Sequence, residues 1–89
     1  MEITITNKAQ KFMEKIEKSD YKTFDKLSFI IENIPNLILT RQGDIKQLQG
    51  QKGFFRLRAG NIRIIFRPDR NANKIVIENI DFRGNVYKQ

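Results

Sequence analysis

The hydrophobic pattern of the chain changes its period near residue 54, and this change limits the fold more than any other feature of the sequence. Before it, apolar residues recur every three or four positions, which is typical of amphipathic helices. After it, apolar and polar residues alternate through residues 54–59, 62–67 and 74–82, which is typical of strands with one buried face. The sequence therefore predicts an α+β fold with a small antiparallel sheet.

Two helices are expected in the first third of the chain. Residues 2–6 alternate and predict a short strand, and Asn7 after them is a candidate N-cap. Residues 8–18 carry an apolar stripe at helical spacing, and a second helix is expected over 21–33, ending before Pro35. Two helices joined so closely should form an antiparallel hairpin that packs on the sheet.

The middle of the chain is harder to assign. Residues 35–53 mix a short apolar run with several glycines, and the sequence predicts an ordered loop there. The expected order of elements is then β-α-α-β-β-β. A length of 89 residues without a linker-like break indicates a single domain, 1–89.

Composition narrows the chemistry open to the chain. It has no cysteine and no histidine, so thiolate chemistry and the commonest zinc ligands are missing. The ten acidic residues are scattered, and we expect no metal site and no cofactor. No apolar stretch has the length of a signal peptide core or of a membrane span, so a cytoplasmic protein is expected.

The charge of the chain is strongly positive. Lysine and arginine number 17 against 10 acidic residues, which gives a net charge of +7. Such an excess favours a polyanionic partner, either a nucleic acid, an anionic membrane surface or an acidic protein. The charge alone does not choose among them, and a basic balance also keeps a small domain soluble.

The predicted hairpin over 55–67 sorts its side chains into two kinds. If residues 60–61 form a two-residue loop, Arg58 lies directly opposite Arg63, and opposed side chains share a face. One face is then apolar and consists of Phe55, Leu57, Ala59, Ile62, Ile64 and Phe66. The other face, which we call the arginine face, carries Arg56, Arg58, Arg63, Ile65 and Arg67.

The arginine face should be unfavourable for folding by itself. Like charges directly opposed on paired strands cost about 0.2 to 1 kcal/mol. We therefore expect an anionic ligand, absent from the free chain, to relieve the repulsion, and Arg63→Ala to leave the fold intact or slightly more stable. The alternative is a solvated face on which the arginines only spread their stems.

The hairpin and the C-terminus resemble a known family. The run GFFRLRAGNIRIIF at 53–66, followed by FRGNVY at 82–87, is similar to the hairpin and the Arg-x-x-x-Tyr tail of RelE/ParE-type toxins of type II toxin–antitoxin systems. The segment DIKQLQG at 44–50 is similar to the stretch that precedes that hairpin. The resemblance covers most of the chain and implies a RelE-like fold, a two-helix hairpin on a small antiparallel sheet.

The resemblance also implies a function. It suggests a toxin held inactive by an acidic antitoxin in a hetero-oligomer, whose ribonuclease-active relatives cut messenger RNA on the ribosome without a metal and so inhibit translation. In that reaction a ribose 2′-OH attacks the adjacent phosphate, and cations stabilise the developing negative charge. Carried over by position, the implied site consists of Arg56, Arg58, Arg63, Arg83 and Tyr87.

The chain departs from active relatives at the groups that move protons. A guanidinium stays charged near neutral pH and cannot serve as a general base. Active relatives often have a lysine where this chain has Arg56, and some have a histidine or glutamate near the C-terminus, where this chain has Asp81 and Phe82. The remaining candidates for proton transfer are Lys52, Glu78, Asp81 and Tyr87, with Tyr87 favoured as general acid.

Two further functions fit the same residues. A ParE-like inhibitor of DNA gyrase shares the fold and needs no RNA-cutting residues, and the missing lysine and histidine favour it. A catalytically weak module could bind RNA or an antitoxin without cutting. The endoribonuclease remains the leading hypothesis because the hairpin gathers four arginines on one face.

Overall fold

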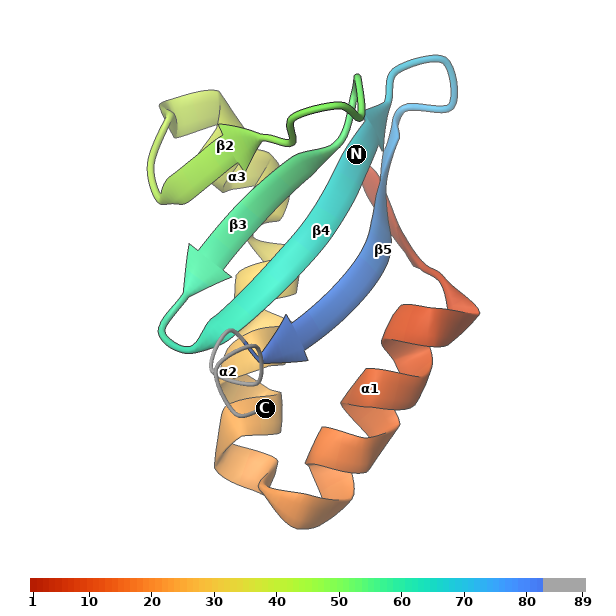
Figure 1. The fold of residues 1–89 in the computed structure, drawn as a ribbon. Helices are drawn as coiled ribbons and strands as arrows, with labels where there is room; N and C mark the ends of the chain where they lie inside the picture. Colours follow the sequence, from red (N-terminus) through yellow and green to blue (C-terminus); the bar gives the residue numbers. More distant parts are fainter. Residues whose placement is uncertain (83–89) are drawn as a thin grey trace.

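Five strands and three helices make up residues 1–82, the part of the chain that the structure, a computed structural model, describes. They are β1 (Glu2–Ile5), α1 (Asn7–Ser19), α2 (Tyr21–Glu32), α3 (Ile34–Thr40), β2 (Asp44–Gln47), β3 (Phe55–Ala59), β4 (Ile62–Asp69) and β5 (Lys74–Phe82). The sheet order is β1-β5-β4-β3-β2 (Figure 1). β1 is parallel to β5 and the other pairs are antiparallel, which confirms the α+β class with one parallel pair added.

The predicted helix hairpin is confirmed, and its caps explain where it turns. Thr6, and not the predicted Asn7, caps α1, because its Oγ1 accepts a hydrogen bond from the N–H of Ala9 at 3.3 Å. Asp20 separates the helices, and its carboxylate accepts hydrogen bonds from the N–H and the hydroxyl of Thr23 at 3.2 and 2.6 Å. The side chain of Asp20 thus starts α2 directly after α1 ends.

The loop expected over 35–53 is wrong in two places. Pro35 lies in the first turn of α3, where a backbone N–H has no acceptor within the helix, so proline loses no hydrogen bond there. It therefore begins a third helix. Arg41 ends α3 in the left-handed conformation, with φ at 58°. Residues 44–47 then add β2 to the edge of the sheet, beside β3. The observed order is therefore β-α-α-α-β-β-β-β.

The predicted register of the hairpin is confirmed, and it places the core. Leu57 pairs with Ile64 and Arg58 with Arg63, so the apolar face turns toward α1 and α2. The buried cluster combines both helices with the sheet, and its residues are Ala9, Met13, Leu27, Ile31, Ile34, Leu57, Ile62, Ile64, Phe66, Ile75, Ile77 and Ile80. The opposite face of the sheet carries no helix among residues 1–82 (Figure 1).

Candidate functional site

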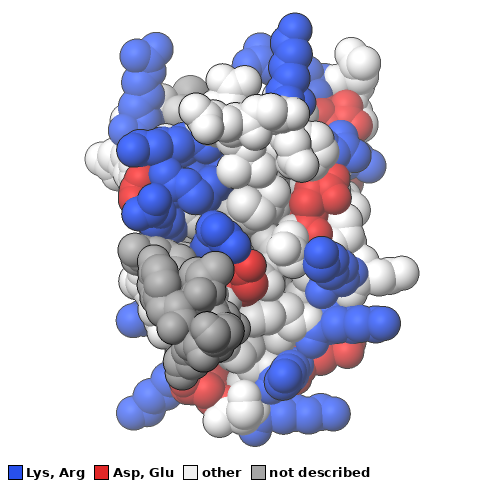
Figure 2. Space-filling model, viewed as in Figure 1, with Lys and Arg blue, Asp and Glu red and all other residues white. Residues whose placement is uncertain are grey.

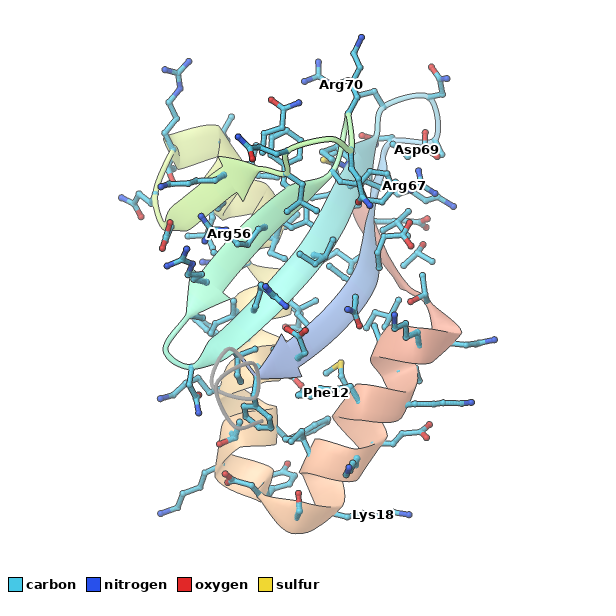
Figure 3. All side chains as sticks on the ribbon, in the orientation of Figure 1. Phe12, Lys18, Arg56, Arg67, Asp69 and Arg70 are labelled. Atoms are coloured by element: carbon cyan, nitrogen blue, oxygen red, sulfur yellow. The ribbon has the colours of Figure 1, made fainter. Side chains whose placement is uncertain are left out.

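The four arginines of the hairpin lie on this open face of the sheet. Arg56 and Arg58 come from β3, and Arg63 and Arg67 come from β4. In Figure 2 the basic atoms gather over β2 and β3, whereas acidic atoms lie beside them toward β5. Figure 3 shows Arg56 and Arg67 on this same side, above neighbouring strands. The strand register thus brings the four guanidinium groups to one surface, as predicted.

Arg63 is held by a carboxylate of the next strand. Its Nε and Nη2 donate hydrogen bonds to the two carboxylate oxygens of Asp81 at 3.1 and 2.9 Å, across the directly paired strands β4 and β5. A bidentate pair of this kind is stronger than a single neutral hydrogen bond. The expectation that only an absent ligand offsets the repulsion from Arg58 is therefore wrong, because Asp81 supplies the negative charge within the chain.

Arg67 is also paired, through an irregularity in β5. Ile65 pairs with Asn79 but Phe66 pairs with Ile77, so Glu78 is an extra residue in the ladder. The Nε of Arg67 donates a hydrogen bond to Glu78 Oε2 at 2.7 Å. The bulge thus provides Arg67 with a partner that plain alternation along the strands would not place there.

Arg56 differs from the other arginines because it is buried. The residue is only 9% exposed, and its Nη1 has no hydrogen-bond partner among the described residues. The nearest carboxylate oxygen, Oδ1 of Asp44, lies 3.6 Å from Nη1, which is beyond a good hydrogen bond. The expectation of a fully exposed arginine face is wrong at this position. Because Nη1 is shielded from solvent, Arg56 acts on an anion at the open face through its positive charge and not through a direct contact of this atom.

Arg58 is the most exposed of the four guanidinium groups. Its side chain is 42% exposed, and its Nε lies 4.0 Å from Oδ2 of Asp44, at the outer limit of an ion pair. Asp44 pairs with Arg58 in the β2–β3 register and lies between Arg56 and Arg58. The β2–β3 half of the arginine face therefore holds two loosely paired guanidinium groups around one half-exposed carboxylate.

Asp44 is a residue of this site that the sequence pattern does not indicate. Residues 35–53 were expected to form a loop, and without β2 there was no register to place Asp44 beside Arg58. Asp44 lies between the arginines because β2 pairs with the edge of the sheet. β2 has only four residues, which are too few for alternation of apolar and polar residues to predict a strand.

The candidates for proton transfer are dispersed. Asp81 and Glu78 are bound to Arg63 and Arg67. Lys52 lines a groove beside α3, together with apolar-face residues such as Phe55, and not the arginine face. Arg83 and Tyr87 lie outside the described residues, so their predicted roles stay predictions.

Residues 1–82 contain neither a metal-binding cluster nor a membrane-spanning helix. No group of three or more histidine, cysteine, aspartate or glutamate side chains within this part is placed to hold a metal ion. No helix in the same range has the length and apolar character needed to cross a membrane.

Comparison with solved structures identifies the architecture. A YoeB/ParE toxin from Agrobacterium tumefaciens superposes with a TM-score of 0.78 at 18% identity, over 92% of this chain and 98% of the other. The YoeB dimer from Staphylococcus aureus gives 0.75 at 19% identity, over 92% and 95%. An archaeal RelE–RelB complex from Pyrococcus horikoshii gives 0.64 at 24% identity, over 93% and 94%. The chain has the RelE/YoeB-type toxin fold.

The likeness to RelE/YoeB-type toxins is one of structure. No model of a known protein family and no curated protein sequence matches the chain. The three superpositions nevertheless cover 92–93% of this chain and 94–98% of the other chain.

Proposed function

We propose that the chain is the toxin of a type II toxin–antitoxin system and acts as a metal-independent endoribonuclease that cuts messenger RNA on the ribosome. The RelE/YoeB-type fold supports this assignment. One observation carries it: Arg56 and Arg58 lie on the open face around Asp44, and the described residues leave both without a tight hydrogen bond to a carboxylate. Such a pair suits a phosphate group.

In this proposal the residues divide the chemistry between them. Arg58 binds the non-bridging oxygens of the phosphate at the bond to be cut, and the positive charge of the buried Arg56 guanidinium stabilises the negative charge that builds up in the transition state. Asp44 is 49% exposed and accepts the proton of the attacking 2′-OH, a role that an arginine cannot fill. Attack of the 2′-oxygen forms a 2′,3′-cyclic phosphate and breaks the bond from phosphorus to the 5′-oxygen, which takes its proton from Tyr87 in this proposal. Arg63 and Arg83 complete the proposed site.

The proposed partner is an acidic antitoxin that forms a hetero-oligomer with the chain in the cytoplasm. The net charge of +7 favours an acidic partner. Solved structures with the same fold include the archaeal RelE–RelB complex and a YoeB–YefM complex from Staphylococcus aureus. An antitoxin encoded with this chain should therefore carry a net negative charge and abolish its toxicity on co-expression.

A second candidate is inhibition of DNA gyrase. Arg63 and Arg67 are already bound to carboxylates, which lowers the number of cations open to a phosphate. One structural neighbour is a YoeB/ParE toxin. A ParE-like inhibitor of gyrase would share this fold and would not require the residues that cut RNA. Loss of supercoiling by purified gyrase in the presence of the chain would favour this candidate.

The deciding experiment is induction of the chain in growing cells, followed by mapping of transcript 5′ ends. The proposal expects growth arrest, new 5′ ends within translated reading frames and a fall in protein synthesis. Growth arrest without new 5′ ends, together with a loss of negative supercoiling in cellular DNA, would assign the chain to the gyrase inhibitors. Growth without arrest would contradict both toxin functions.

A further inference from the structure

A groove beside α3 lies apart from the arginine face. It has a volume of about 590 Å³ and is bounded by α3, β2 and the adjoining parts of β3 and β4. Its apolar lining comes from residues of four elements: Leu37, Ile38, Ile45, Phe55, Phe66 and Pro68. Phe55 and Phe66 stack on each other with their ring centroids 5.8 Å apart. The groove therefore extends the apolar side of the sheet to the surface.

The strand lengths explain why this apolar surface is left open. β4 continues to Asp69, whereas its pairing with β3 ends at Phe66 opposite Phe55. Pro68 is tolerated in β4 because one side of the strand has no neighbour there. In Figure 1, α1 lies beside β5, α2 passes behind β3 and β4, and the seven residues of α3 lie behind β2.

The rim of the groove is basic, and its charges have no ionic partner among the described residues. Arg41, Lys52 and Arg70 line it, and none of its other described lining residues is acidic. No ion pair within residues 1–82 involves any of the three. This differs from the arginine face, where a carboxylate lies within 4.0 Å of each guanidinium group. Arg70 extends from the turn between β4 and β5, at the top of Figure 3.

We propose that this α3 groove is a docking site for an acidic amphipathic segment of a partner protein. Apolar side chains of the segment fill the groove, and its carboxylates face Arg41, Lys52 and Arg70. An RNA strand fits less well, because stacking needs exposed aromatic faces and Phe66 is fully buried against Phe55. The inference rests on the proposed function where it takes the partner to be the antitoxin.

A labelled synthetic peptide tests the site directly. The probe has about 16 residues, with leucines at helical spacing on one face and glutamates on the other, and its control has the same composition in scrambled order. Anisotropy with the full-length chain should show binding of the first peptide only. Ile38→Glu, in the lining, should weaken binding at least about tenfold. Leu39→Glu, one residue later and outside the lining, should change it by less than about twofold.

A second pair of variants separates the rim from the overall charge. Arg70→Gln and Lys15→Gln each remove one exposed positive charge, but Lys15 lies on α1, away from the groove. Only Arg70→Gln should weaken peptide binding, by about threefold or more. Equal losses for both members of either pair, or equal binding of the scrambled peptide, would overturn the proposal.

Two further readouts separate this inference from its rivals. Sedimentation of the chain alone should give a monomer; a dimer that Ile38→Glu dissociates would assign the groove to a second copy of the chain and overturn the proposal. Growth arrest by Ile38→Glu should equal that of the original chain. Absence of arrest from the original chain would contradict the proposed function and leave the peptide result to stand alone.

Discussion

Arg63 and Asp81 face each other across β4 and β5 and share two hydrogen bonds, at 3.1 and 2.9 Å. The pairing of Arg58 with Arg63 across β3 and β4 places two positive charges side by side, and Asp81 offsets one of them from the other flank. The arginine face is therefore divided into a paired half around Arg63 and Arg67 and a loosely paired half around Arg56 and Arg58.

Removal of Arg63 should destabilise the fold, contrary to the expectation from the hairpin alone. The side chains of Arg63 and Asp81 are 36% and 33% exposed, so solvent weakens their attraction. Arg63→Ala should lower the free energy of unfolding by about 1 kcal/mol in urea titrations. A double-mutant cycle with Asp81→Ala should give a coupling of about 0.5 kcal/mol. A more stable Arg63→Ala protein would contradict the pairing.

Arg56 should contribute more to function than to stability. Burying a guanidinium without an acceptor for Nη1 costs free energy, and methionine can occupy the space of its stem. Asp44 is half exposed and stays hydrated when its neighbour is removed. We expect the free energy of unfolding of Arg56→Met, measured in urea, to be unchanged or higher by up to about 1 kcal/mol. RNA cleavage by this variant should fall. A large loss of stability would make Arg56 a structural residue.

Asp44 should control the rate of cutting. Asp44→Asn keeps the size of the side chain but removes the proton acceptor, and loss of general base catalysis costs about 10² to 10⁴ in rate. Asp25→Asn, at an exposed position of α2, is the matched control and should cut at the original rate. Quantified cleavage of a defined messenger RNA measures both. Unchanged cleavage by Asp44→Asn would remove Asp44 from the mechanism.

The Asp20 cap should make stability depend on pH. Hydrogen bonds from the Thr23 hydroxyl and then from the Thr23 N–H lower the pKa of Asp20 below its ordinary value of 3.8. A depressed pKa in the folded state stabilises the fold above the unfolded-state value, and this contribution is lost as the pH falls through the folded pKa. Asp20→Asn should therefore melt earlier near neutral pH, and the difference in Tm should narrow below about pH 4. A constant difference would contradict this account.

The sequence predicts the hairpin well because its local rules agree. Alternation in β3 and β4, together with a two-residue loop that contains Gly60 at φ 61°, allows only one register without mixing the two faces. The helix hairpin is predictable for the same reason, since the apolar stripes and the Asp20 cap indicate the same boundaries. Where several local signals coincide, the fold follows from them.

The carboxylates of the site could not be placed from the sequence because they depend on pairing between distant residues. Asp44 enters through β2, whose four residues gain their strand conformation from β3. Glu78 reaches Arg67 only because of the bulge between Ile65 and Phe66 in the β4–β5 pairing. Neither β2 nor the bulge leaves a periodic signal in the sequence, so the pattern predicts the cations of the arginine face but not the carboxylates beside them.

Cleavage of messenger RNA on purified ribosomes tests the central claim most directly. Arg58 and Arg67 lie on the same face, but only Arg67 is held by a short hydrogen bond to a carboxylate. At equal concentrations of folded protein, Arg58→Ala should cut at least about 10²-fold more slowly than the original chain, and Arg67→Ala should stay within about tenfold. Cutting by Arg58→Ala at the original rate would contradict the account.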